Sequence, residues 1–129
     1  MGIEFHNKYI EGKTKNTCTV EKMENDMIYV IATSTLKEGC KDEFVKLALA
    51  NYKNVHAEAG CISYLLNEDC ATGMPNQPAL RENCVTFVEC WESVEHLKAH
   101  LGQPHMKAFM EAVKPLRISS ELRILTPVK

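Results

Sequence analysis

The stretch formed by residues 83–105 constrains the fold most, because it combines a strand pattern with two successive helix starts. Side chains at 84–91 alternate between two sets, and β-branched and aromatic residues are frequent among them. This period of two predicts a half-buried strand with two different faces. Ser93 then stands where a helix N-cap is expected, and Gly102 ends that helix. Pro104 begins the next helix at its first position.

The remaining elements follow from the same kind of pattern. The expected order is a strand at 27–36, a helix at 41–59, a strand at 61–67, a loop at 68–82, a strand at 84–91, a helix at 94–101, a helix at 104–114 and a strand at 120–126. This order predicts an α+β fold with a ferredoxin-like split β-α-β sheet and helices on one face.

Length and composition narrow the class of protein. With 129 residues, of which 45% are hydrophobic and 25% charged, the chain predicts one ordinary globular domain. The formal net charge of −2 and the lack of a long apolar run give no reason to expect a nucleic acid or membrane partner. We interpret the polar residues 1–26 as an N-terminal extension and residues 27–129 as the domain.

Cysteine usage predicts the compartment. The chain has six cysteines but no Cys-x-x-Cys pair, and its first residues lack the apolar segment of a secretory signal. We therefore expect a cytoplasmic protein whose thiols are mostly free.

Several residues in a fixed order carry a resemblance to a known family. They are Glu89, Trp91, His100, Leu101, Pro104 and His105, together with the segments MIYVIATSTLKEG, EAGCISYLLNED and ELRILTPV. This arrangement, from about Met27 to Val128, resembles the antibiotic biosynthesis monooxygenase family. The resemblance implies a dimeric α+β barrel, in which a second copy covers the bare face of the sheet. It also implies a pocket in each subunit between the sheet and the helices.

The third predicted strand carries the candidate substrate-binding residues. Phe87, Glu89 and Trp91 share one face, and a carboxylate between two aromatic residues must be paired, at an edge or functional. Pairing with Arg123 or Lys37 is the structural alternative for Glu89. Tyr64 and Trp91 either line a pocket or fill the core. Family members that oxidise polycyclic phenols have Trp at the match to Trp91 and Asn four residues earlier; here Phe87 replaces that Asn, which argues against that substrate class.

Two histidines are the candidate catalytic residues. Helical spacing places His100 at the boundary of the apolar face of its helix, and His105 at the flank of the next helix. Either can act as a general base near neutral pH, or can instead bond to the backbone as a structural residue. His96 and His100 are spaced like a metal-binding pair, but no third ligand follows, so we expect no metal site.

The leading functional hypothesis is a cofactor-independent monooxygenase that oxidises a quinol or another electron-rich aromatic with O2. His100 or His105 would act as base or anchor, and Phe87 and Trp91 as pocket walls, because the substrate itself supplies the electrons. The alternatives are an isomerase or degradative enzyme for a small polar metabolite, and a ligand-binding dimer without enzymatic activity. We expect a cavity that touches Trp91 and at least one of these histidines.

Overall fold

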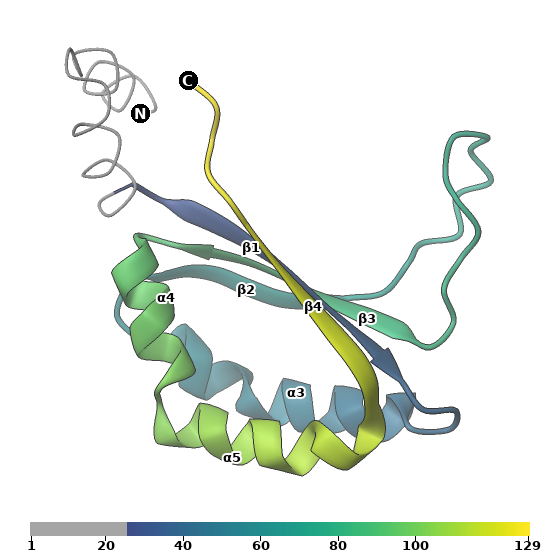
Figure 1. Cartoon of the computed structure of the whole chain (residues 1–129), viewed down its shortest axis with the longest axis horizontal. Helices are drawn as coiled ribbons and strands as arrows, with labels where there is room; N and C mark the ends of the chain where they lie inside the picture. Colours follow the sequence, from purple (N-terminus) through teal and green to yellow (C-terminus); the bar gives the residue numbers. More distant parts are fainter. Residues whose placement is uncertain (1–25) are drawn as a thin grey trace.

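Residues 26–129 form a four-stranded antiparallel sheet, and the helices of this part of the chain lie on one face of it (Figure 1). The computed structural model describes residues 26–129, so the predicted extension at 1–26 lies outside the described residues except for Asp26. The elements are β1 (Ile28–Leu36), α3 (Lys41–His56), β2 (Cys61–Asn67), β3 (Cys84–Trp91), α4 (Val94–Leu101), α5 (Pro104–Val113), the 3₁₀ turn η1 (Lys114–Leu116) and β4 (Arg117–Leu125). The strand order is β2-β3-β1-β4. The expected α+β architecture is therefore confirmed.

Local chemistry explains where α4 and β2 begin. The Ser93 hydroxyl accepts a hydrogen bond from the backbone N–H of His96 at 3.2 Å, so Ser93 is the N-cap of α4 as predicted. Gly60, just before β2, has φ +82°, and a Cβ at this position would collide with the ring of His96. Only glycine fits here, because other residues are strained in this backbone region and would also meet that ring.

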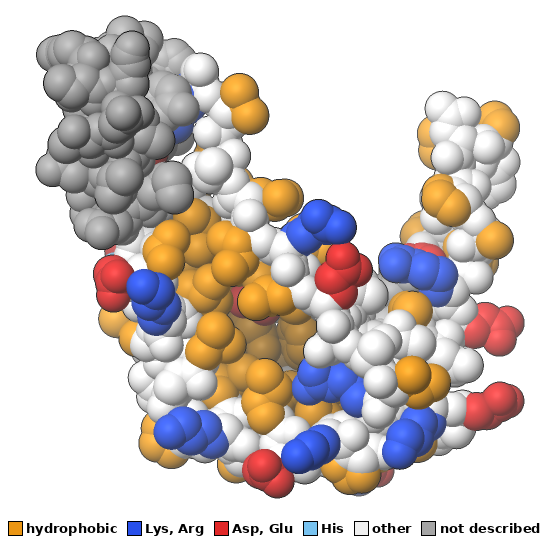
Figure 2. All heavy atoms as spheres, in the orientation of Figure 1, with side chains coloured by type: hydrophobic (Ala, Val, Ile, Leu, Met, Phe, Trp, Pro, Cys, Tyr) orange, Lys and Arg blue, Asp and Glu red, His pale blue; other side chains and the backbone are white. Residues whose placement is uncertain are grey.

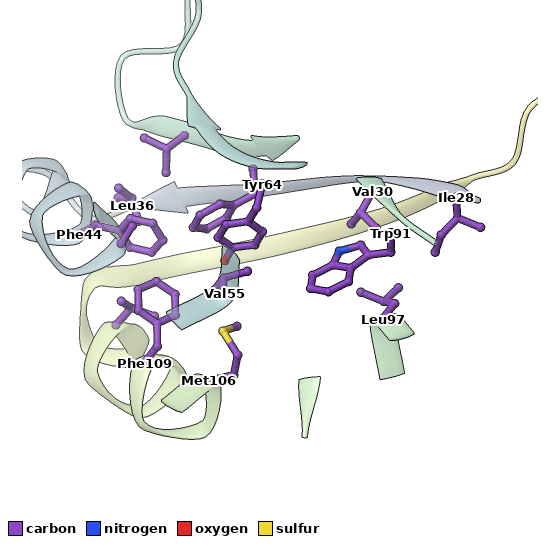
Figure 3. Close-up of a cluster of buried hydrophobic side chains, with 14 residues drawn as sticks. Ile28, Val30, Leu36, Phe44, Val55, Tyr64, Trp91, Leu97, Met106 and Phe109 are labelled. Atoms are coloured by element: carbon purple, nitrogen blue, oxygen red, sulfur yellow. The ribbon is translucent and has the colours of Figure 1, made fainter. Parts of the chain in front are cut away.

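The core lies between the inner face of the sheet and the helices. Val85, Phe87 and Trp91 of β3 are buried on this face, as the alternation predicted. Figure 3 shows side chains of the helices, including Phe44 and Phe109, packed against residues that point inward from the strands. Burial of this apolar surface is the main force that holds the helices against the sheet.

The last strand begins earlier than the sequence predicted. Pro115 ends α5 as expected, but the chain continues through η1 and enters β4 at Arg117 rather than at residue 120. Arg117 pairs with Leu36, and Leu125 pairs with Tyr29, so β4 runs along all but the first residue of β1. The earlier start matters because it makes Arg117 part of the sheet edge.

The outer face of the sheet carries exposed apolar side chains. Tyr29, Leu65, Val88 and Leu125 lie on this face by alternation and are between 39% and 53% exposed. No helix among residues 26–129 covers this face (Figure 1). None of the helices in this part of the chain is long and apolar enough to cross a membrane.

Residues 68–83 form an arm that projects from the sheet between β2 and β3 (Figure 1). Its base is closed by Arg81, whose backbone N–H, Nε and Nη2 donate hydrogen bonds to the Asp69 carboxylate at 2.9, 3.0 and 2.8 Å. These bonds to Arg81 lower the pKa of Asp69 to about 2.

Candidate active site

A cavity of about 240 Å³ lies between the inner face of the sheet and helices α4 and α5. Figure 2 shows it as a hollow lined with hydrophobic side chains, with an acidic side chain recessed inside it. Its walls include Val30, Tyr64, Phe87, Leu97, Met106 and Phe109. An apolar recess with few polar groups is typical of a small-molecule site.

Glu89 is the buried carboxylate of this cavity. It is 5% exposed, and its Oε1 accepts a hydrogen bond from Trp91 Nε1 at 2.9 Å. The pairing with Arg123 or Lys37 considered from the sequence is therefore wrong; Arg123 pairs with Glu121 instead. Burial raises the pKa of Glu89 to about 7, although the bond from Trp91 opposes this rise. Glu89 thus titrates near neutral pH inside a largely apolar recess.

The prediction that Trp91 forms a wall of the cavity is wrong, because Trp91 is completely buried and is not among the residues that line the cavity. Figure 3 shows it next to Val30 and Leu97. Its ring centroid lies 4.6 Å from that of His100. Because its N–H is directed at Glu89, Trp91 fixes the carboxylate from behind the cavity wall.

His100 lines the cavity and is 1% exposed. Its Nδ1 lies 3.0 and 3.1 Å from the two carboxylate oxygens of Glu58, so we assign the proton to Nδ1 and the lone pair to Nε2. Burial lowers the pKa of His100 and so favours the neutral ring, although Glu58 has the opposite effect and raises this pKa. The predicted boundary position was wrong, because the buried side of α4 is set by Leu97 and His100, whereas Leu101 is 43% exposed.

Glu58 is a site residue that the sequence analysis missed. Its carboxylate is 9% exposed, and its Oε2 also lies 2.8 Å from His105 Nε2. His105 does not line the cavity, and its ring N–H is not aligned for a hydrogen bond with Glu58. No local pattern could have revealed Glu58, because its partners lie on α4 and α5, more than forty positions along the chain.

Tyr64 and Phe87 form an aromatic wall of the cavity. Their rings stack with centroids 5.0 Å apart, and both residues line the recess. Burial and the nearby charge of Glu89 raise the pKa of the Tyr64 hydroxyl far above its usual value, so this group stays protonated. Such a wall can hold the face of an aromatic ligand.

Among residues 26–129, no three His, Cys, Asp or Glu side chains gather into a metal-binding group. Five cysteines in the same range are free: Cys40, Cys61, Cys70, Cys84 and Cys90. The prediction of free thiols is confirmed for these five, and Cys18 lies outside the described residues.

The fold and the cavity define a small α+β protein with a largely apolar cavity between sheet and helices. Residues 27–112 match the family described as "Antibiotic biosynthesis monooxygenase". The chain is 38% identical over 91 residues to "Probable quinol monooxygenase YgiN" of Escherichia coli (strain K12), covering 70% of this chain and 83% of that protein. The protein therefore belongs to the antibiotic biosynthesis monooxygenase family.

Solved structures show the same fold. A structure from Caulobacter crescentus CB15, named for the antibiotic biosynthesis monooxygenases, is 25% identical with a TM-score of 0.69 and covers 86% of this chain and 99% of its own. Rv0793 from Mycobacterium tuberculosis is 23% identical with a TM-score of 0.68, over 81% of this chain and 97% of its own.

Proposed function

We propose that the protein is a monooxygenase that oxidises a quinol or another electron-rich aromatic with O2, and that Glu89 accepts the phenolic proton. The observation that carries this proposal is a carboxylate with a pKa of about 7 in an apolar cavity. A general base works best when its pKa lies near the working pH. Membership of the monooxygenase family and the likeness to a protein named a quinol monooxygenase support the same reaction class.

The proposed reaction balances without an added reductant. Proton transfer to Glu89 leaves a quinolate, which donates one electron to O2 and gives a semiquinone and superoxide. These two radicals combine in a new carbon–oxygen bond, and the proton held by Glu89 passes to the peroxide. The resulting hydroperoxide loses water to give a hydroxyquinone. The substrate supplies all four electrons, so one oxygen atom enters the ring, the other leaves as water, and no flavin, haem or metal is required.

The surrounding residues have separate roles in this proposal. Tyr64 and Phe87 bind the ring, because they line the cavity as an aromatic wall. His100 also lines the cavity and offers the lone pair of Nε2 as a second acceptor for a phenolic proton. Trp91 is a positioning residue that orients Glu89. His105, which lies near Glu58 and outside the cavity lining, supports the carboxylate that holds His100.

We also propose that the protein is a cytoplasmic homodimer whose copies pack through the outer face of the sheet. The exposed apolar residues Tyr29, Leu65, Val88 and Leu125 support this arrangement, because such a face is stabilised by being covered. Sedimentation velocity at micromolar concentration should give about twice the 14.6 kDa of one chain. A stable monomer under these conditions would contradict the dimer.

Oxygen uptake with a panel of quinols, with and without added flavin or metal, tests the reaction. Glu89→Gln should lower the rate by ~10²–10⁴-fold, the usual effect of losing a general base. Glu92→Gln is the matched control, because Glu92 is exposed and lies next to β3. His100→Ala should also lower the rate, whereas His96→Ala should not. Wild-type rates in Glu89→Gln would refute the assignment of the base.

A further inference from the structure

Arg117 lines the same cavity, at the start of β4, and the proposed reaction does not use it. Its Nε is buried and has no hydrogen-bond partner among residues 26–129. Its Nη2 contacts the sulfur of Met110 at 3.5 Å, and a thioether is only a weak acceptor. The guanidinium therefore has strong donors that the described protein groups do not satisfy.

The other two arginines show what is unusual about Arg117. Arg81 binds Asp69 at 2.8 Å, and Arg123 binds Glu121 at 3.1 Å. Arg117 forms no ion pair with a carboxylate in the described part of the chain, and burial lowers its pKa. A partly buried cation without an anionic partner is destabilising, unless a ligand supplies the anion.

Further donors lie at the same end of the cavity. Ser34 of β1 and Ser120 of β4 are paired across the strands, and both line the cavity. Among the described residues that line the cavity, Glu121 is the one carboxylate near this end; it is exposed and already pairs with Arg123. Hydroxyl groups beside a guanidinium can complete the binding of a carboxylate.

The pairing of the strands shows that Arg117 and Glu89 lie far apart along the sheet. Glu89 is paired with Val30 of β1, whereas Arg117 is paired with Leu36 of the same strand. At about 3.3 Å per residue, these positions lie roughly 20 Å apart along β1. The side chains shorten that gap, but one ligand can reach both groups only if its anion stands away from the hydroxyl, on a side chain or a second ring.

We infer that Arg117 binds an anionic group of the substrate, so that the preferred substrates are aromatic quinols bearing a carboxylate on a side chain. The identity of the aromatic part rests on the proposed function, whereas the anion site rests on Arg117 alone. Arg117 is thus a specificity-determining residue at the opposite end of the cavity from Glu89.

The test compares acids with their methyl esters, which lack the charge and differ otherwise by one added methyl group. The probes are 2,5-dihydroxybenzoate, 2,5-dihydroxyphenylacetate and 3-(2,5-dihydroxyphenyl)propanoate. Dissociation constants are measured without oxygen by calorimetry, and oxygen uptake is measured separately. Wild type should bind the longest acid about 10- to 100-fold more tightly than its ester, as expected for bonds to charged groups. The preference should fall with the shorter acids.

Arg117→Gln should bring the acid-to-ester ratio close to one, while Arg117→Lys should keep part of it. Arg123→Gln is the matched control and should keep the wild-type ratio. Equal binding of acid and ester by wild type would overturn the inference. So would an Arg117→Gln protein that changes its sedimentation but keeps the acid preference, since Arg117 would then serve a subunit contact.

The two proposals fail separately. Arg117-dependent binding of acids without oxygen uptake would support the anion site and refute the monooxygenase reaction. Oxygen uptake with neutral and acidic quinols alike would support the reaction and refute the anion site.

Discussion

Replacing Glu89 with Gln should stabilise the protein at high pH. Burial raises the pKa of Glu89 from its ordinary value of 4.5 to about 7. Between these two values the folded protein holds a proton on Glu89 that the unfolded chain has released. The contribution of this residue to the free energy of unfolding therefore falls as the pH rises through this interval. The glutamine side chain of the Glu89→Gln variant would stay neutral and could still accept the bond from Trp91.

The magnitude follows from the change in pKa. Each pKa unit corresponds to about 1.4 kcal/mol, so ionised Glu89 destabilises the fold by about 3 kcal/mol above pH 7. The free energy of unfolding of Glu89→Gln should exceed that of wild type by up to this amount at pH 8, and the two values should match near pH 4. The lowered pKa of His100 also makes stability depend on pH, but this effect cancels when the two proteins are compared.

Urea unfolding at fixed protein concentration measures the difference at several pH values. Trp91 is the only tryptophan, and its fluorescence reports the unfolding of the site directly. Glu92→Gln, a change at an exposed position, should show no such dependence on pH. A difference between Glu89→Gln and wild type that stays constant with pH, or a variant less stable at pH 8, would refute the reasoning.

Three further changes test the supporting structure. Trp91→Phe removes the hydrogen bond that lowers the pKa of Glu89, so the pH–rate profile should shift to higher pH; an unmoved profile would contradict this role. Glu58→Gln should destabilise the protein by about 1–3 kcal/mol in urea unfolding, while the exposed Glu95→Gln should change stability by less than about 0.5 kcal/mol. Gly60→Ala should lower the melting temperature more than Gly39→Ala, because both have a positive φ but only Gly60 faces the His96 ring; equal losses would refute that clash.

The sequence was most informative where one local pattern decides the structure. Cys61–Asn67 was predicted with the observed ends, and Ser93 was identified as the cap of α4, because alternation and capping are local properties. Helix ends were less certain: α3 ends at His56 rather than at residue 59. Turns of backbone beyond a helix often keep helical spacing, so periodicity alone does not fix the last residue.

The candidate site was only partly predictable. The shared face of Phe87, Glu89 and Trp91 follows from a period of two, but the bond between Glu89 and Trp91 depends on rotamers that the sequence does not specify. Glu58 and Arg117 were missed for a different reason. Glu58 lies just beyond α3 and Arg117 is the first residue of β4, and the importance of each comes from neighbours that only the packed sheet and helices bring together.

The closed base of the arm at 68–83 has a consequence for protein engineering. Because Asp69 and Arg81 already join the two ends of the arm, the chain between them can change length without shifting the register of β2 and β3. The entropic penalty of added loop residues grows only logarithmically with length. The tip near Met74 is therefore the place to insert an epitope or a fluorescent reporter peptide while the cavity, which the arm does not line, stays intact.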